Sequence, residues 1–327
     1  MLIKGSKRIH FDDSVDPAHG VVRWRPAKSL WITAMTLIGA IGAPFTFSWN
    51  AVGIFLLLTG VTLCAGHSVG MHRRLIHNSF ECPLWLEYFL VWLGVLVGMA
   101  GPIGMMRQHD LRDWAQRQTT CHDYLCHRRG ILLDYFWQCH CDLDLKGGPQ
   151  FRPEGRVAED RVYAFMERTW MLQQAPLAIL LFSLGGWAFI VWGVALRVTV
   201  SVTGHWLIGY FAHHEIRPGN ARMSWRVLSA SVQGRDVPIA GFISMGESWH
   251  NNHHAYPGSA KIGLLPGQPD PGWQFIRLLA ALGMAWDIRL PANMPDRPDL
   301  IRLGGRGTGW RICHVRRRLW ALIFNTA

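Results

Sequence analysis

The sequence predicts an all-α integral membrane protein with four transmembrane helices and a cytoplasmic helical cap. Half of its 327 residues are hydrophobic and only 17% are charged, whereas an ordinary soluble domain is about 25% charged. The chain also contains 17 Trp residues, and Trp concentrates at membrane–water interfaces. This composition excludes a disordered chain and a disulfide scaffold. The net charge of +11 alone would fit a soluble nucleic-acid binder, but the distribution of the charges, described below, favours a membrane protein.

The first charge-free stretch runs from Ser29 to His72 and contains no Asp, Glu, Lys or Arg. Because about 20 apolar residues cross a bilayer as a helix, this stretch is long enough for two crossings. Pro44, Ser48 and Asn50 mark a turn. We therefore predict transmembrane helices at about 30–49 and 51–71.

The second stretch, residues 169–214, has Arg197 as its only charged residue. A turn at Ser183-Leu184-Gly185-Gly186 predicts two further helices, at about 169–184 and 187–210. An Arg inside a membrane helix needs a partner, and we expect structural pairing, with Glu87 as the candidate.

A fifth apolar run, Tyr88–Met106, is predicted to be interfacial or re-entrant. Its glycines and Pro102 make a straight helix unfavourable. A spanning helix here would also place His77 and His109 on opposite sides of the membrane, although both are candidate metal ligands.

The positions of Lys and Arg predict the orientation. Both short turns between the predicted helices lack them, whereas they are frequent before Ser29, between 107 and 168, and after His214. The positive-inside rule therefore places both termini and the polar segments in the cytoplasm. We expect a leader (1–28) that is not a signal peptide, one membrane domain (29–290) with cap segments 107–168 and 215–290, and a basic tail (291–327). The seven Cys are expected to be free thiols.

The 16 histidines include a compact cluster, His250-Asn251-Asn252-His253-His254. In a helix, residues i, i+3 and i+4 share one face, so three imidazoles would converge. Imidazole nitrogen suits iron, copper and zinc. We therefore interpret the cluster as metal-binding rather than as three solvated surface histidines.

Two further sites contain histidine. His72 and His77 follow the second predicted helix, and a spacing of five residues turns an α-helix by about 140°. This spacing suits two metal ions or a helix that ends between the two rings. The intervening Arg73 and Arg74 could be interfacial anchors. His205 lies in the fourth predicted helix, where a polar ring is either functional or a hydrogen-bonded core residue.

In this order, these motifs resemble those of the membrane-bound acyl-CoA (stearoyl-type) fatty acid desaturases, in a bacterial-like form. The Gly246-Glu247-Ser248-Trp249 segment, directly before the third motif in chain order (His250–His254), strengthens the resemblance. The resemblance implies a four-helix stem, a cap that holds a histidine-rich di-iron site, and an acyl chain in a bent apolar tunnel. The histidines that match the family's ligands are His72, His77, His109, His205, His250, His253 and His254.

The second histidine motif is altered, because His109 is followed by Arg112 and Asp113 where the family has two more histidines. Arg cannot ligate a metal, but a carboxylate can. We therefore expect Asp113 to be a ligand, and Arg112 to compensate charge or to contact a substrate acid or phosphate. Ser201 stands where the family often has an Asn that reaches iron through water.

Other residues near the motifs are weaker candidates. His122, in the run Cys121–His127, could substitute for a missing ligand or support one, as could Ser201 and Asn251. The more conservative interpretation makes the run, Cys139–Cys141 and His213–His214 packing residues.

The resemblance implies an O2-dependent acyl desaturase with two non-haem iron ions. Its substrate would be an acyl-CoA, an acyl-ACP or a lipid-linked chain, with Arg73, Arg74 and Arg112 as candidate contacts to an acidic carrier. Electrons would come from a separate donor (a ferredoxin, a rubredoxin or a cytochrome b5-like protein), since no haem domain is recognisable after residue 290. Membrane lipid is an expected partner and nucleic acid is not. The alternatives are a hydroxylase or acetylenase on the same scaffold, or a non-catalytic protein that binds lipid or metal.

Overall fold

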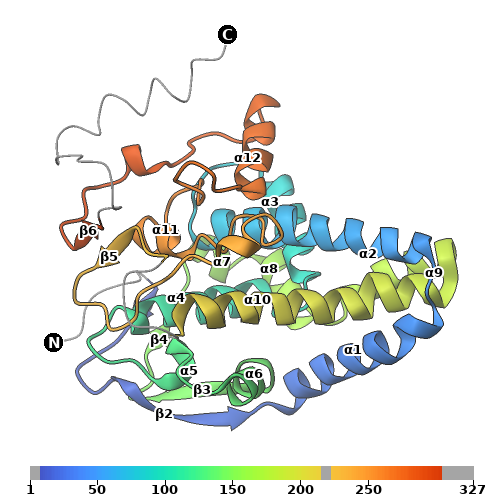
Figure 1. Ribbon diagram of the computed structural model, residues 1–327, viewed down its shortest axis with the longest axis horizontal. Coiled ribbons are helices and arrows are strands. Elements are labelled where there is room, and N and C mark those ends of the chain that lie inside the picture. Colours follow the sequence, from blue (N-terminus) through green and yellow to red (C-terminus); the bar gives the residue numbers. More distant parts are fainter. Residues whose placement is uncertain (1–7, 215–221, 304–327) are drawn as a thin grey trace.

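The structure, a computed structural model, describes residues 8–214 and 222–303 (Figure 1). Residues 1–7 of the predicted leader, 215–221 of the predicted cap and 304–327 of the predicted tail lie outside the described residues. In Figure 1 the long helices extend to the right of the picture, and the short helices and strands gather at the left.

Three helical stretches of the described chain are long and apolar enough to cross a membrane: Pro26–Phe45, Trp49–Ile76 and Gln174–His213. They comprise α1 (Pro26–Phe45), α2 (Trp49–Val61) with the π-helical η1 (Thr62–Ile76), and α9 (Gln174–Ile190) with the π-helical η2 (Val191–Leu196) and α10 (Arg197–His213). Their outer faces are apolar, and Phe45 and Trp49 are 86% and 78% exposed. Such faces are suited to contact with lipid rather than water.

The first helix begins earlier than predicted and lies partly in the predicted leader. Pro26 occupies its first turn, where a missing N–H costs nothing and the fixed φ favours the helix. The chain leaves the helix after Phe45, and Ser48 caps α2 by accepting a hydrogen bond from the Ala51 N–H. The turn between the two helices therefore lies at the predicted position, next to Ser48.

The last stretch, Gln174–His213, contains 40 residues and would be about 60 Å long if straight, twice the thickness of the hydrocarbon layer. Its backbone is not helical at Gly185 and Gly186, and Gly186 has a φ of +62°. A positive φ is accessible to glycine without steric cost. The break lies in the segment for which a turn was predicted.

The remaining helices surround the end of this bundle. They are α3 (Leu84–Val95), α4 (Pro102–Gln116), α5 (Asp123–Cys126), α6 (Ile131–His140), α7 (Gly155–Ala158), α8 (Arg161–Arg168), α11 (His250–Ala255), α12 (Pro271–Ala281) and the 3-10 helices η3 (Pro238–Ala240) and η4 (Pro291–Asn293).

The all-α prediction was wrong in one respect, because the described residues also form three antiparallel two-stranded sheets. The pairs are β1 (Ile9–His10) with β4 (Gln150–Phe151), β2 (Asp16–Trp24) with β3 (Cys141–Lys146), and β5 (Trp225–Val227) with β6 (Leu300–Arg302). In β3, buried Leu143 and Leu145 alternate with Asp142 and Asp144, the period of a half-buried strand. Strand β2 lies in the predicted leader and β6 in the predicted tail, so the described part of each segment contributes a strand to a sheet.

The run Tyr88–Met106 is not one straight helix. Helix α3 ends at Val95, Gly98 has a φ of +87°, and α4 begins at Pro102. Arg197 donates a hydrogen bond of 2.6 Å to the Leu96 carbonyl just beyond the end of α3, where the helix dipole favours a cation.

The predicted Arg197–Glu87 pair was wrong. The Arg197 guanidinium instead donates to the carbonyls of Gly193 and Leu96 and to the side chains of Gln174 and Thr62. These dipoles satisfy the buried cation without a carboxylate. Glu87 accepts from Arg74, Arg156 and Tyr163.

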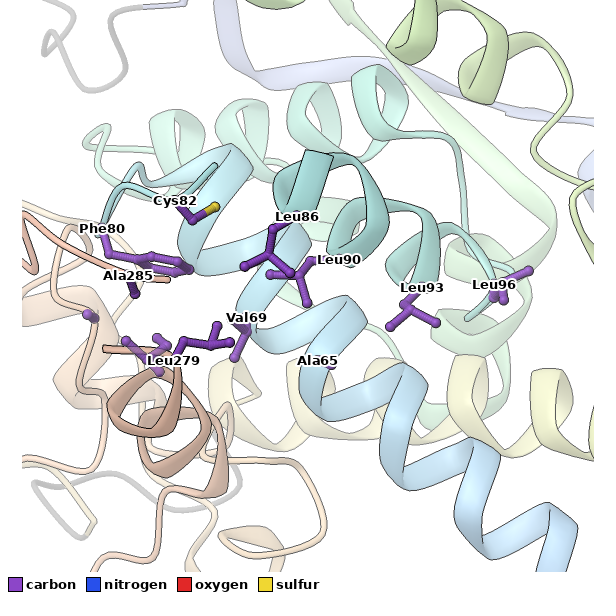
Figure 2. Close-up of a cluster of buried hydrophobic side chains, with 12 residues drawn as sticks. Ala65, Val69, Phe80, Cys82, Leu86, Leu90, Leu93, Leu96, Leu279 and Ala285 are labelled. Carbon is purple, nitrogen blue, oxygen red and sulfur yellow. The ribbon is translucent and has the colours of Figure 1, made fainter. Parts of the chain in front are cut away.

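Helix α3 packs closely against η1, and α12 completes this part of the core. Figure 2 shows Leu86 and Leu90 of α3 beside Val69 of η1, with Leu93 farther along α3 and Leu279 of α12 nearby. The approach requires glycine, because a Cβ at Gly66 would lie 2.4 Å from the Leu93 carbonyl carbon and one at Gly70 2.5 Å from that of Leu90. This contact fixes α3 against the helix that carries His72 and His77.

Gly66→Ala and Gly70→Ala are therefore expected to destabilise the protein by about 1–3 kcal/mol each, the range typical of overpacking. Gly60 is the matched control on the same continuous helix, because a Cβ there meets nothing within 4 Å. Gly60→Ala should leave stability unchanged or raise it slightly, since alanine favours a helix. Unfolding midpoints in detergent check the difference, and equal midpoints for all three variants would contradict this packing.

Candidate metal centre

Two groups of histidines converge where η1, α4, α10 and α11 meet. The first group contains His72 and His77 of η1 and its C-cap, His109 of α4, and His253 of α11. One ring nitrogen of each residue lies within 4.8 Å of those of the others. The Nε2 atom of His77 is 3.2 Å from Nε2 of His72 and 3.3 Å from Nε2 of His109.

The second group contains His213 at the end of α10 and His250 and His254 of α11. Their three Nε2 atoms form a triangle with sides of 3.1, 3.1 and 3.2 Å. Ligand nitrogens that stand about 2.1 Å from one ion, at right angles to each other, are about 3.0 Å apart. The second group therefore has the spacing of three ligands to one metal ion.

The protonation of these rings also fits metal binding. Burial holds the pKa of His250 and His253 well below the usual range, and it lowers the pKa of His254 to about 4. These imidazoles are therefore neutral at pH 7, and neutral imidazole is the form that ligates a metal. Two groups of converging nitrogen donors, which include these three neutral imidazoles, fit two transition-metal ions.

The π-helical backbone explains why His72 and His77 belong to one group. The His77 N–H donates to the His72 carbonyl, five residues earlier, over 3.1 Å. This wider winding brings residues five apart closer to the same face than an α-helix does. The sequence alone left open that His72 and His77 bind two different metal ions, because it assumed an α-helix. That assumption does not apply to this π-helical segment.

The predicted helix over the third motif is present as α11, but its histidines divide between the groups. His253 belongs to the first group, and His250 and His254 belong to the second. Helix α11 therefore connects the two sites.

Side chains outside the groups hold α11 in place. The Asn251 side chain accepts from the N–H groups of Ser224 and Trp225 and donates to the carbonyls of Trp225 and Gly234. The Arg297 guanidinium donates to the carbonyls of His254 and Ala255, at 2.9 and 2.7 Å. Asn251, a candidate ligand in the sequence, is thus engaged with the backbone.

His205 does not belong to either group, and His213, interpreted above as packing, does. The His205 ring lies beside His67, with ring centroids 4.8 Å apart. His213 Nδ1 donates to the Gly209 carbonyl at 2.9 Å, which leaves its Nε2 toward the other two ligands. Position along the helix could have favoured His213 over His205. His213 lies eight residues closer to the end of the helix, which is about 12 Å along its axis.

The altered second motif places Asp113 near both groups. Burial raises the pKa of Asp113, but attraction to His109, His253 and His254 outweighs this effect and leaves the pKa well below its usual range. The half-buried carboxylate is therefore ionised, although it is in neither of the two groups. Arg112 instead donates to His127 and Gln138.

Arg73 and Arg74 are buried in ion pairs rather than exposed as interfacial anchors. The Arg73 guanidinium pairs with Asp270 at 2.8 Å and Glu247 at 3.4 Å, and its side chain is 1% exposed. Arg74 pairs with Glu81 and Glu87. These carboxylates thus neutralise both buried cations.

Glu247 is a further site residue that the sequence interpretation did not single out. Its Oε2 lies 2.5 Å from His72 Nδ1, and its Oε1 accepts from the Ser68 hydroxyl at 2.6 Å. A carboxylate against the outer nitrogen of a ligand histidine fixes the ring and raises its basicity. Its position three residues before His250 could have indicated it.

Two remaining candidates do not contribute ligands to the groups. His122 caps α5, where its Nδ1 accepts from the Tyr124 N–H at 3.1 Å. Ser201 is buried in α10, and its hydroxyl has no hydrogen-bond partner among the described residues.

Comparison with known proteins is consistent with this site. Residues 47–260, which contain both histidine groups, match the family model described as fatty acid desaturase. The chain is 35% identical to an sn-1 stearoyl-lipid 9-desaturase of Anabaena variabilis, over 80% of this chain and 94% of that protein. It is 32% identical to an acyl-CoA 5-desaturase of Anemone leveillei, over 79% and 77% of the two chains. It is also 32% identical to an sn-2 palmitoyl-lipid 9-desaturase of a Nostoc species, over 75% and 84%.

Proposed function

The chain belongs to the fatty acid desaturase family, and we propose that it uses O2 and a non-haem di-iron centre to insert a double bond into a fatty acyl chain. The observation that carries this proposal is the convergence of two groups of histidines. Relatives are named for acyl chains on lipids and on CoA, and the substrate of this chain is proposed to be one of these.

In this proposal each histidine group holds one iron ion. Bound iron supplies an oxidant strong enough to remove hydrogen from an unactivated methylene, which no side chain can do. The ionised Asp113, electrostatically coupled to His109, His253 and His254, is proposed to complete the ligand set. Arg112 is proposed to compensate charge through His127 rather than to bind a substrate phosphate.

The overall reaction sets what the protein must receive. Removing two hydrogen atoms from the acyl chain while reducing O2 to two waters requires two further electrons and two protons. A separate donor protein is proposed to supply the electrons, as expected from the sequence.

The proposed topology has four crossings, with both termini and the metal centre in the cytoplasm. The break at Gly185 and Gly186 supports two crossings within Gln174–His213. The distribution of Lys and Arg supports the orientation. The hydroxylase, acetylenase and non-catalytic alternatives are not favoured, because the relatives named above are desaturases.

Two measurements test the function together. Protein purified in detergent is expected to contain close to two iron ions per chain, and lipids from an expressing host should contain acyl chains lighter by two hydrogen atoms. The control is His77→Ala, which removes a ligand candidate of the first group and should abolish the product. Chains heavier by one oxygen atom would indicate hydroxylation, and protein without iron or product would refute the proposal.

A further inference from the structure

A network of polar side chains lies beside His213 and joins α4, the end of α5, α6 and α10. Arg112 of α4 donates from Nη1 to His127 Nε2 at 2.8 Å. His127 follows α5, and its Nδ1 lies 2.8 Å from Oδ1 of Asp134 in α6. The same oxygen accepts from the Trp206 indole of α10, also at 2.8 Å. The side chains of His127 and Asp134 are 1% and 0% exposed.

The partners of His127 fix both its tautomer and its orientation. Because a guanidinium can only donate, His127 Nε2 must accept from Arg112. The ring proton is therefore on Nδ1, which donates to the Asp134 carboxylate. The backbone is held as well, because the His127 carbonyl accepts from His214 Nδ1 at 2.6 Å.

This fixed ring lies against a member of the second histidine group. The rings of His127 and His213 are stacked, with centroids 5.7 Å apart and planes only 6° from parallel. Gly209 allows this approach, because a Cβ there would lie 3.3 Å from His127 Nε2 and 3.6 Å from Arg112 Nη1. The carbonyl of the same Gly209 accepts from His213 Nδ1. The His213 ring is thus held in two ways: its Nδ1 donates to the Gly209 carbonyl, and one of its faces packs against His127.

From this geometry we propose that His127, held by Arg112 and Asp134, is a positioning residue for His213 and so determines the affinity of the second metal site. This inference rests on the proposed function, because it requires that site to bind metal. It also gives Arg112 a role: the residue at a position where a ligand histidine was expected supports a different ligand.

The decisive experiment measures the second site alone. In a background that carries both His77→Ala and His109→Ala, only His72 and His253 remain in the first group. The chain should then bind a single Co2+ ion, at the second group. Adding His127→Ala should weaken Co2+ binding by about 10- to 100-fold, the usual effect of losing an outer partner of a ligand histidine. Arg112→Met and Asp134→Leu, which each remove one hydrogen-bond partner of His127, should weaken Co2+ binding in the same direction.

His122→Ala is the matched control. His122 lies five residues before His127 and holds the N-terminus of α5, so its loss reports a general disturbance of this segment. Co2+ affinity in this control should match that of the parent with His77→Ala and His109→Ala. Unchanged affinity in folded His127→Ala, or in the two other variants should His127→Ala not fold, would overturn the inference. No Co2+ binding by the parent would refute the proposed second site itself.

Discussion

Replacing His213 with alanine is expected to remove one of two bound metal ions and to abolish acyl desaturation. The second histidine group has three members among the described residues, so the variant would keep only His250 and His254 there. Losing an outer partner of a ligand already costs about 10- to 100-fold in metal affinity or activity, and losing the ligand itself should cost more. The first group shares no residue with the second and should retain its ion.

His205→Ala is the matched comparison on the same helix. Its ring lies beside His67 and outside both groups, so this variant should keep two ions per chain. Iron content and host lipid profiles measure both variants. Loss of an ion from His205→Ala with two ions kept in His213→Ala would show that the sequence-based assignment of His205 was right.

The membrane helices were predictable because charge is costly in a bilayer. The absence of charge between Ser29 and His72 depends on local composition alone, and the structure has long helices there. The small sheets were not predictable, because each pairs segments far apart in the chain. Strand β2, for example, pairs Gly20 with Leu145, and nothing near Gly20 indicates its partner.

The sequence predicted most of the histidines of the site but not how they are grouped in space. The spacing of His250, His253 and His254 predicted a helix with converging rings, but their division between two groups depends on where other elements present ligands. The shared group of His72 and His77 depends on a π-helical backbone that the sequence does not reveal. The partners of Arg197 include backbone carbonyls, which leave no trace in the sequence.

Replacing Arg73 is expected to have a second large effect, a loss of stability. Its guanidinium contacts both oxygens of Asp270, at 2.8 and 3.3 Å, and donates to the carbonyls of Ala260 and Met245. Asp270 in turn caps α12 by accepting from the Trp273 N–H. The pair therefore joins η1, which carries His72, to the segment before α11 and to α12.

Arg73→Met is expected to destabilise the protein by about 3–5 kcal/mol, the usual cost of removing one partner of a buried ion pair. The Asp270 side chain is only 2% exposed, so water cannot replace the lost cation. Glu247 would lose the same partner, and because it contacts His72, metal content should fall with stability. Unfolding in detergent, with and without added iron, measures both effects.

Arg277→Met is the control for removing a cation from this region. Arg277 lies on the exposed side of α12, where it donates to Gln274, and exposed substitutions usually change stability by less than about 0.5 kcal/mol. If both variants unfolded at the same midpoint, the Arg73–Asp270 pair would contribute nothing beyond an ordinary surface charge. A lower midpoint together with a lower metal content in Arg73→Met alone would instead mean that the first histidine group depends on a cation outside that group, because Arg73 contacts Glu247 and Glu247 contacts His72.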